Sequence, residues 1–340
     1  MREPLVSVIV VNYNGKTFLN RCLGSLLKTE YSSFIVILVD NGSSDGSPDL
    51  ANDEFGHDPK LKIVKNAANL GFAEANNIGM RHAKGKYVVL LNNDTIVDKK
   101  WLSELTKVME NDISIAAAQS KLLLMDRPML YDCAGGFLDH SGGTYARGHF
   151  TRDTGQYEKT EEIFTCKGAA MILRRDALRK VGLFDSTYFF YYEETDLCWR
   201  IWLAGYKVVF VPTSVIYHKG GASVPKEPSQ QIFFQVYLLN RNRIMTLLKN
   251  YEIRNLFAYL TPWLLLEARI IMSAGLRGYR RSNMLYSLAS SKAILWNLRN
   301  LRSIWKKRLY VQRIVRKLPD SEVIPKMAVK SANYESKNHC

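Results

Sequence analysis

Cysteine is scarce in this chain of 340 residues, and no two cysteines lie close together in the sequence. The five are odd in number, widely scattered and outside any C-x-x-C motif: Cys22, Cys133, Cys166, Cys198 and Cys340. This spacing supports neither a disulfide framework nor a zinc site, so we expect a reducing compartment. The chain enters an expected strand at Val6 without a preceding signal-peptide stretch, so we expect a cytoplasmic protein rather than an exported one.

Acidic residues are scarce in the last fifth of the chain. From Gly275 onward there are fifteen Lys and Arg residues but three acids, so this region holds +12 of the formal net charge of +15. A basic region of this kind suits nucleic acid, anionic lipid or simple solubility. Because it contains no recognisable nucleic-acid-reading motif, we expect an anionic membrane surface rather than nucleic acid as the partner.

A long uninterrupted apolar run is also missing. The most apolar stretch, Leu256–Met272, contains Glu267 and Arg269. It falls short of the roughly 20 apolar residues that a spanning helix needs. The stretch favours a helix at a membrane interface, with a buried or dimer-forming helix and a spanning helix as the alternatives.

The segment that follows has the pattern of a basic amphipathic helix. Its apolar side chains recur at helical spacing: Ile294, Leu298, Leu301 and Trp305. Its basic side chains recur on another face: Lys292, Arg299 and Lys306. Such helices lie on anionic membranes; the alternative is a helix packed on the rest of the protein with a solvated basic face. We expect residues 226–318 to be helical and residues 319–340 to be disordered.

Short β-branched segments alternate with helical patterns through the first part of the chain. Strands are expected at Val6–Val11, Phe34–Asp40, Leu61–Asn66, Tyr87–Asn92 and Ile115–Ala118. This alternation predicts an α/β, Rossmann-like fold with a mostly parallel sheet. Because these strands are apolar along their whole length, we expect helices on both faces of the sheet.

The rest of the expected catalytic domain, residues 1–225, is less regular. Met125–Ile163 is rich in glycine and polar residues and predicts a long loop or irregular hairpin at the edge of the sheet. Order is expected to resume with strands at Ala169–Arg174 and Lys207–Val211 and helices at Arg175–Val181 and Glu194–Ala204.

Polar residues end several of the predicted strands, and ligands of open α/β sheets bind at the carboxyl ends of strands. Asn12 and Asn14 follow the first strand. Asp40 ends the second, where an acid commonly binds a ribose or a base. The alternative role of acids here is to cap the next helix, which we expect of Asp45.

Two residues suit a hard divalent cation. Asp94 ends the fourth strand beside Asn92 and Asn93, where a carboxylate can hold an ion that itself binds a diphosphate. His218 follows the last strand, and imidazole suits manganese-like ions. An isolated strand-end Asp is more often a cap and a lone His more often structural, so it is their combination that favours a metal site.

Three acids, Glu193, Glu194 and Asp196, crowd the start of a predicted helix, where the helix dipole stabilises negative charge. Asp196 can pair with Arg200 four residues later, which would keep it ionised. Glu194 has no cation at helical spacing, and neighbouring carboxylates raise its pKa. It is therefore the candidate general base, with Asp196 second. The alternative is an ordinary run of acids at a helix N-terminus.

Taken together, these motifs resemble the family 2 glycosyltransferases with the GT-A fold, of the bacterial rhamnosyltransferase-like branch. The matching segments cover roughly residues 5–222, in the family's order: VSVIVVNYNG, LVDNGSSDGS, NLGFAEANNIGM, YVVLLNNDT, CKGAAMILRRDAL, VGLFD and YYEETDLCWRIWLAGY. The resemblance implies inverting transfer of a sugar from a nucleotide-diphosphate donor, with dTDP-rhamnose and UDP-sugars as candidates. The acceptor would be a glycan or a polyprenyl-linked glycan in cell-surface polysaccharide synthesis.

The resemblance also implies roles for individual residues. Asp94 and His218 would hold Mg²⁺ or Mn²⁺, and Glu194 would be the base. The residues expected to contact the donor are Val11, Asn12, Asn14, Asp40, Asn69, Gly71, Asn76, Asn92, Asn93 and Gly168. Two motifs depart from the family: its D-x-D sequence appears as Asn92-Asn93-Asp94, and its frequent Glu-Asp pair appears as Glu193-Glu194. We expect the protein at the inner face of the cell membrane and predict no oligomeric state.

Two other functions remain as alternatives. A sugar nucleotidyltransferase shares the sheet and the strand-end acid, but it places a Gly-rich loop with Arg after the first strand, where this chain has NYNGKTFL. A non-enzymatic basic binding module would leave Asp94, Glu194 and His218 without a purpose.

Overall fold

The computed structural model describes residues 3–220, 227–276 and 281–328. Its strands are β1 (Val6–Asn12), β2 (Phe34–Asp40), β3 (Leu61–Lys65), β4 (Tyr87–Asn92), β5 (Thr95–Val97), β6 (Ile115–Leu124), β7 (Arg127–Cys133), β8 (Gly136–Leu138), β9 (Thr144–Ala146), β10 (Glu161–Glu162), β11 (Ala170–Arg174) and β12 (Lys207–His218). Its α-helices are α1 (Lys16–Leu26), α2 (Ser47–Phe55), α3 (Gly71–His82), α4 (Trp101–Asn111), α5 (Arg175–Val181), α6 (Glu193–Leu203), α7 (Pro228–Asn250), α8 (Ile253–Leu276), α9 (Arg281–Arg299), α10 (Leu301–Tyr310) and α11 (Asp320–Val323).

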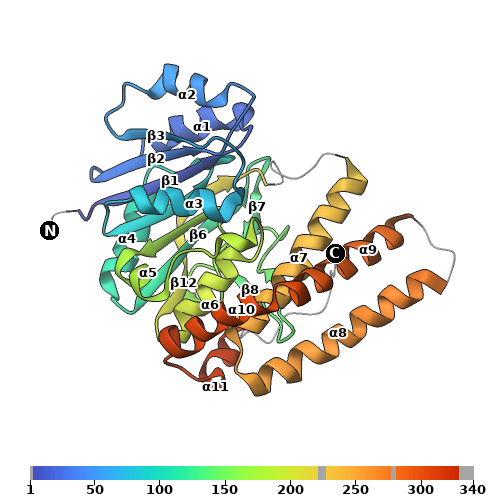
Figure 1. Ribbon diagram of the computed structural model, residues 1–340. Coiled ribbons are helices and arrows are strands. Elements are labelled where there is room, and N and C mark those ends of the chain that lie inside the picture. The colour runs from blue at the N-terminus through green and yellow to red at the C-terminus, as the bar shows by residue number, and fades with distance from the viewer. Residues whose placement is uncertain (1–2, 221–226, 277–280, 329–340) are drawn as a thin grey trace.

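One mixed sheet organises the molecule (Figure 1). Its order is β10-β12-β6-β11-β4-β1-β2-β3. Strands β3, β2, β1 and β4 are parallel, as are β6 and β12, whereas β11 lies antiparallel between β4 and β6. The expectation of a mostly parallel sheet is therefore confirmed. Strand β11 is antiparallel in its centre, and the short strands β5 and β10 and strand β7 pair antiparallel to β12 and β6.

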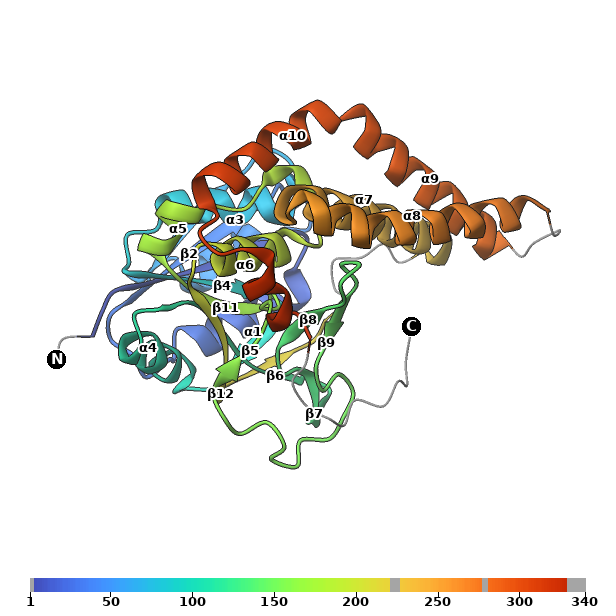
Figure 2. The same ribbon diagram turned by 90° about the horizontal axis from the view of Figure 1, so that it is seen from below.

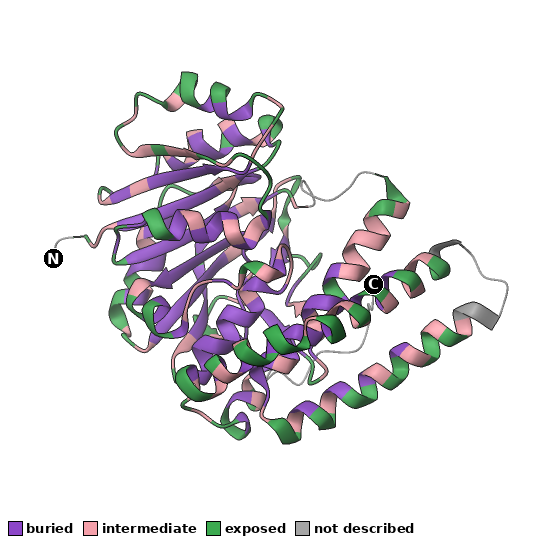
Figure 3. Ribbon diagram, viewed as in Figure 1, coloured by how far each residue is buried: buried purple, intermediate pink, exposed green. Residues whose placement is uncertain are grey.

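Helices cover both faces of this sheet because the central strands are apolar on both sides. Along β1, Val8 and Val10 point to the layer that contains α1, α2 and α4, and Ile9 points to the layer that contains α3, α5 and α6. All three are fully buried. Figure 3 shows the sheet as a continuous buried layer between the helices. The carboxyl ends of β1, β2 and β4 are thereby held rigidly side by side.

Two strands extend beyond their predicted ends. β6 continues to Leu124 because its second half pairs with β7 and β12. β12 continues past Pro212 to His218 through a register shift between Val211 and Val215. Residues 125–163, predicted as a loop or irregular hairpin, contain the short strands β7 to β10, of which β8 and β9 form a separate two-stranded sheet.

Of the C-terminal helices, α10 and the end of α7 pack on the part of the protein that contains the sheet, whereas α8 and much of α9 extend away from it side by side (Figures 1 and 2). Ile244 and Met245 of α7 belong to the same hydrophobic core as Leu197 and Trp199 of α6. The predicted boundary at residue 225 falls outside the described residues.

The prediction of disorder from residue 319 is wrong for the first part of this tail. Residues 320–323 form α11, residues 324–326 form a 3₁₀ turn, and Met327 is fully buried. The Met327 carbonyl accepts a hydrogen bond of 3.0 Å from the backbone N–H of Leu138. Residues 329–340 lie outside the described residues.

The predicted basic amphipathic helix is two helices, α9 and α10, that meet at Asn300. Their packed side is not the predicted apolar stripe. Ala289, Ala293 and Asn297 are buried, whereas Leu298 and Trp305 are exposed. Small residues let α9 pack closely. Of the predicted apolar stripe, Ile294 packs partly against the core, whereas Leu298, Leu301 and Trp305 stay exposed.

Within the described residues, one helical segment, Ile253–Ser273 in α8, is long and apolar enough to cross a membrane by length and composition. Only 22% of its most apolar window is buried inside the protein.

Candidate active site

Polar side chains link the ends of β1, β2 and β4. The amide nitrogen of Asn12, which is fully buried, lies 3.1 Å from Asp40 Oδ1 and 2.8 Å from Ser47 Oγ. Its amide oxygen accepts a 2.8 Å hydrogen bond from Asn93 Nδ2. Asn12 and Asp40 are direct partners in the parallel register of β1 and β2. The structure thus brings these three predicted donor residues together, and Asn12 acts as the link between them.

The turn after β1 is fixed by the turn after β2. Asn14 has a positive φ of 50°, its N–H donates to Ser43 Oγ, and its side-chain oxygen accepts from the Ser44 N–H. Asp45 accepts hydrogen bonds from the N–H and hydroxyl of Ser47, the first residue of α2, and from the N–H of Lys16, the first residue of α1. The N-cap of α2 is Gly46, so the prediction that Asp45 caps this helix is wrong, and Asp45 instead ties the starts of the two helices together. Val11 is half-buried in the strand that ends here.

Asn69 and Gly71 shape the start of α3. Asn69 Oδ1 accepts from the Gly71 N–H and from Asn41 Nδ2. Gly71 has a φ of +82°, and an added Cβ would lie 2.5 Å from the Phe189 ring. Asn76 is buried and donates to the carbonyl of Phe72, so its amide nitrogen is used within α3.

Asp94 and His218 lie together, as the sequence predicted. β5 pairs with β12 so that His218 stands opposite Thr95, the residue after Asp94. His218 Nε2 lies 3.3 Å from Asp94 Oδ1 and 3.4 Å from Asn92 Nδ2. Both Asp94 and His218 are buried.

Asp132, which the sequence reasoning missed, holds the other side of the imidazole. Its Oδ2 lies 2.8 Å from His218 Nδ1. Burial lowers the pKa of His218, but hydrogen bonds to Asp132 and Asp94 outweigh it and raise this pKa above its ordinary value. A carboxylate on one imidazole nitrogen fixes the ring so that the other nitrogen can bind a metal.

Lys167 connects this cluster to the helix that carries the candidate base. Its ammonium lies 2.7 and 2.8 Å from the two carboxylate oxygens of Asp132. Burial opposes ionisation of Asp132, but His218 and Lys167 outweigh it and hold the pKa of this carboxyl well below its ordinary range. The charge of Lys167 also acts on Glu194 and lowers its pKa.

Glu193 and Glu194 form a buried pair of carboxyl groups at the start of α6. Burial raises the pKa of Glu193 well above its ordinary value, and the charge of Glu194 raises it further. Burial also raises the pKa of Glu194, against the opposing hydrogen bond from Glu193. One oxygen of each, Oε2, is buried and has no hydrogen-bond partner in the part of the chain that the structure describes. Two close carboxyls that cannot both ionise hold one proton between them, and we assign that proton to Glu193.

Asp196 occupies a structural position. It is fully buried and lies 3.0 Å from Arg200 Nε, 3.0 Å from Lys249 Nζ and 2.9 Å from Asn250 Nδ2. Burial opposes its ionisation, but Lys249 and Arg200 outweigh it and lower its pKa. The predicted pairing with Arg200 is present, and together with the two partners from α7 it leaves Asp196 poorly placed to accept a proton.

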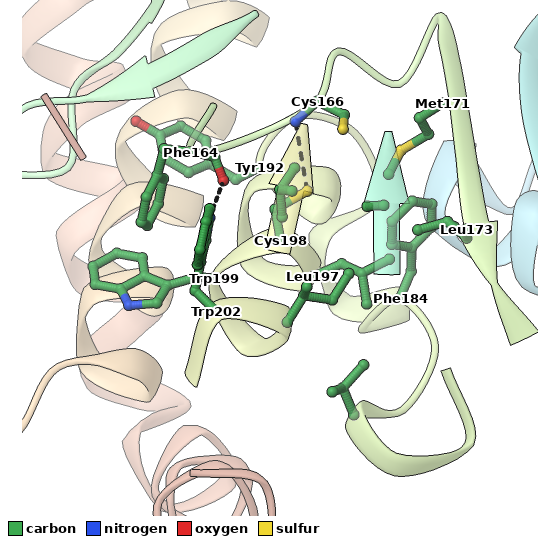
Figure 4. Packing of buried hydrophobic residues seen from close by; sticks show 14 of the residues in the cluster. Phe164, Cys166, Met171, Leu173, Phe184, Tyr192, Leu197, Cys198, Trp199 and Trp202 are labelled. Atoms are coloured by element: carbon green, nitrogen blue, oxygen red, sulfur yellow. Dashed lines mark hydrogen bonds between the residues drawn. The ribbon is translucent and has the colours of Figure 1, made fainter. Parts of the chain in front are cut away.

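The remaining face of α6 fixes its position against the strands. Figure 4 shows Cys198 and Trp202 facing the segment before β11, where the Cys166 N–H donates to Cys198 Sγ at 3.5 Å and Trp202 Nε1 donates to the Phe164 carbonyl at 3.1 Å. Gly168 follows Lys167 in this segment, and an added Cβ would lie 3.3 Å from the Phe72 ring. The middle and end of α6 are thereby anchored to the segment that contains Lys167.

The donor set at Asp94 and His218 fits a divalent cation that is shared with a ligand. Among the described residues, no group of three or more His, Cys, Asp or Glu side chains could hold a metal ion. The carboxylate oxygen of Asp94 and the imidazole nitrogen of His218, which Asp132 fixes from behind, would supply two ligands. The remaining positions would fall to phosphate oxygens and water, the usual partners of Mg²⁺.

Comparison with known proteins identifies the family of this chain. The family model described as Glycosyl transferase family 2 matches residues 7–182. The N-acetylglucosaminyl-diphospho-decaprenol L-rhamnosyltransferase of Mycobacterium tuberculosis is 26% identical over 255 residues, which cover 67% of this chain and 80% of that protein. Matches to three other curated relatives cover 25%, 37% and 46% of their lengths, so the chain spans a quarter to about half of those proteins.

Solved structures show the same fold. The mannosyltransferase PcManGT from Pyrobaculum calidifontis, solved with GDP-Man and Mn²⁺, aligns with a TM-score of 0.55 at 17% identity over 97% of this chain and 89% of that one. GalNAc-T7, solved with UDP, GalNAc and Mn²⁺, aligns with a TM-score of 0.61 at 17% identity over 89% of this chain and 58% of that one.

Proposed function

This chain belongs to glycosyl transferase family 2. We propose that it is an inverting, metal-dependent glycosyltransferase that uses a nucleotide-sugar donor, with Glu194 as its base. The observation that carries the proposal is the convergence of residues from segments that are far apart in the sequence. Asp94, at the end of β4, contacts His218, which contacts Asp132, which contacts Lys167. The charge of Lys167 acts on Glu194 at the start of α6.

The donor would lie across the ends of β1, β2 and β4. Asp40, held by Asn12, offers carboxylate oxygens to a ribose or a base, as strand-end acids do in related sheets. Asp94 and His218 would hold Mg²⁺ or Mn²⁺, which supplies charge neutralisation for the leaving diphosphate. The cationic Lys167 adds positive charge at the same end of the sheet.

Glu194 would remove the proton from the acceptor hydroxyl as that oxygen attacks the anomeric carbon from the face opposite the diphosphate. Its Oε2 atom is buried and has no hydrogen-bond partner among the described residues, so no protein group competes with the acceptor hydroxyl for this oxygen. Glu193 keeps its own proton and leaves Glu194 as the ionised member of the pair. A positioned base of this kind contributes about 10²–10⁴-fold to the rate.

The test is donor binding and turnover with a panel of nucleotide sugars, including dTDP-rhamnose and UDP-sugars. We expect one donor to raise the melting temperature, because ligand at 100 times its Kd adds about 2.7 kcal/mol of stability. Release of the nucleotide diphosphate should require Mn²⁺ or Mg²⁺ and stop with EDTA. Turnover that is unaffected by EDTA would contradict the metal role.

The acceptor is proposed to be a polyprenyl-linked or other membrane-bound glycan, since the mycobacterial relative is named for a decaprenol-linked substrate. The exposed side of α8 supports such a location at the inner face of the membrane. Phe257, Leu265 and Met272 are at least 60% exposed there. Glu267 points inward and accepts hydrogen bonds from Tyr286 and Ser290, so its charge does not face the lipid.

Cosedimentation with vesicles tests this location. We expect binding to vesicles that contain phosphatidylglycerol, weaker binding to pure phosphatidylcholine, and loss of binding in Leu265→Glu. Ile113→Glu, at an exposed position between α4 and β6, is the matched control and should still bind. Equal sedimentation of Leu265→Glu and the wild type would contradict the proposal, and resistance to carbonate extraction would indicate a spanning helix instead.

A further inference from the structure

The loop that leads into Glu193 and Glu194 has an unusual backbone. Phe189, Tyr191 and Tyr192 all have positive φ values, of 64°, 68° and 70°. Phe189 is the centre of a γ-turn, with φ 64° and ψ −61°, which the Phe190 N–H closes on the Tyr188 carbonyl at 2.7 Å. Side chains with a Cβ rarely adopt these conformations, and they persist only where the surroundings impose them.

Asn242 of α7 imposes much of this conformation. Its side chain is fully buried, and its amide nitrogen lies 3.1, 2.8 and 2.7 Å from the carbonyl oxygens of Tyr188, Phe190 and Tyr191. One side chain therefore binds three of the four carbonyls between residues 188 and 191. α7 packs directly beside α6, as Figure 1 shows.

The other contacts of the loop support the same geometry. Arg241 Nη2 donates to the carbonyls of Thr187 and Tyr188, and Arg241 Nε donates to the side-chain oxygen of Asn242. The remaining carbonyl, that of Phe189, accepts from the N–H of Phe72 at the start of α3. Helices α3 and α7, which are far apart in the sequence, thus hold a single strained loop.

We propose that Asn242 is a positioning residue, which holds the 188–192 loop so that the Glu194 carboxylate meets the acceptor hydroxyl. The inference rests on the proposed role of Glu194 as the base. The N-cap of α6, Tyr192, is itself one of the strained residues, so a relaxed loop would rotate the first turn of this helix. A displacement of about 1 Å at a reacting group can cost about 10²-fold in rate.

The test is a double-mutant cycle in the full-length protein. Asn242→Asp replaces the donor nitrogen by an oxygen that repels the three carbonyls, and Asn242→Ala is a second, neutral variant. We expect either to lower kcat by about 10²-fold with the donor KM within about threefold of the wild type. In a Glu194→Gln background the same substitutions should change the residual kcat less than about threefold, because the group they position is already inactive.

The control variant is Asn240→Ala on the same helix, since Asn240 is buried but donates to Ser290 and not to the loop. Its kcat should match the wild type. An equal loss of kcat from the Asn242 variants in both backgrounds would overturn the positioning role while leaving the proposed function intact. If Glu194→Gln itself leaves kcat unchanged, the proposed base is wrong and the inference falls with it.

Discussion

Asp132 Oδ2 lies 2.8 Å from His218 Nδ1, although 86 residues separate them in the chain. This contact places a carboxylate behind the imidazole and leaves Nε2 facing Asp94. Carboxylates in this position commonly fix the tautomer and orientation of a metal-binding histidine. We therefore expect a substitution of Asp132 to change the affinity of the protein for divalent metal ions.

Asp132→Asn is expected to weaken divalent-metal affinity by about 10–100-fold, because the imidazole loses the negatively charged acceptor that orients it and makes it a stronger ligand. The measurement is the Mn²⁺ concentration that gives half-maximal release of nucleotide diphosphate, supported by calorimetric titration of Mn²⁺ in the presence of nucleotide diphosphate. Asp153→Asn is the matched control, since Asp153 pairs with Lys121 and does not touch His218. Equal Mn²⁺ dependence in Asp132→Asn and the wild type would remove Asp132 from the metal site.

Lys167→Met is expected to move the acidic limb of the kcat–pH profile to higher pH. Burial raises the pKa of Glu194 and Lys167 opposes this rise, so removal of the ammonium lets the pKa climb further. Glu194 must be ionised to accept a proton, so activity at a given acidic pH should fall. Measurement at saturating donor and Mn²⁺ separates this effect from weaker metal binding through Asp132. Lys121→Met is the control, and its acidic limb of the kcat–pH profile should match that of the wild type. A shift of this limb to lower pH in Lys167→Met would contradict the account.

Gly71→Ala is expected to destabilise the protein more than Gly205→Ala. Both glycines have a φ of +82°, where alanine costs about 1–2 kcal/mol. An added Cβ at Gly205 meets nothing within 4 Å, whereas at Gly71 it would lie 2.5 Å from the Phe189 ring and 2.7 Å from its carbonyl oxygen. Overpacking of this kind adds about 1–3 kcal/mol. Urea unfolding of the two variants should reveal the difference, and equal losses would mean that the Phe189 loop yields easily.

Asp185→Asn is expected to lower stability by about 3 kcal/mol, because it removes a partner from the buried ammonium of Lys249 and from Lys307. Burial opposes the ionisation of Asp185, but Lys249 and Lys307 outweigh it and depress the pKa of Asp185 strongly. A carboxyl group whose pKa is depressed in the folded protein stabilises the fold fully at pH values above its unfolded pKa of about 3.9. This stabilisation decreases as the pH falls towards the folded pKa.

The stability gap between wild type and Asp185→Asn should therefore be constant near neutral pH and shrink below about pH 4. Thermal or urea unfolding across this range measures it. Asp176→Asn, which breaks an exposed pair with Arg179, should change stability by less than about 1 kcal/mol at any pH. A gap that widens on acidification would show that the Asp185 ion pairs are not its source.

Local patterns were sufficient to predict much of the fold. The sequence predicted β2, β4 and α5 with their observed ends, since each is a short apolar or amphipathic segment bounded by polar residues. It missed the second half of β12 because Pro212 interrupts the pattern, and the continuation depends on pairing with β5 and β6. Order near Met327 was missed for the same reason, since it depends on a contact with Leu138.

For the candidate site, too, local patterns in the sequence predicted some residues and missed others. Asp94, His218 and Glu194 were found because each is a polar residue at the end of a strand or the start of a helix. Asp132 could not be found this way, because it lies in a segment whose glycine content indicated a loop, and its partner is far away in the sequence. Asn242 gives no local signal either, since an asparagine inside a helix reveals nothing about the carbonyls it contacts.

The most direct test of the account is the comparison of donor affinity and turnover in Glu194→Gln. The amide keeps the size of the side chain but cannot take the acceptor proton. We predict that kcat falls by about 10²–10⁴-fold while the Kd of the donor, measured by calorimetry with Mn²⁺, stays within about threefold of the wild type. A donor Kd that weakens as much as kcat falls, or a kcat that does not change, would contradict the assignment of Glu194 as the base.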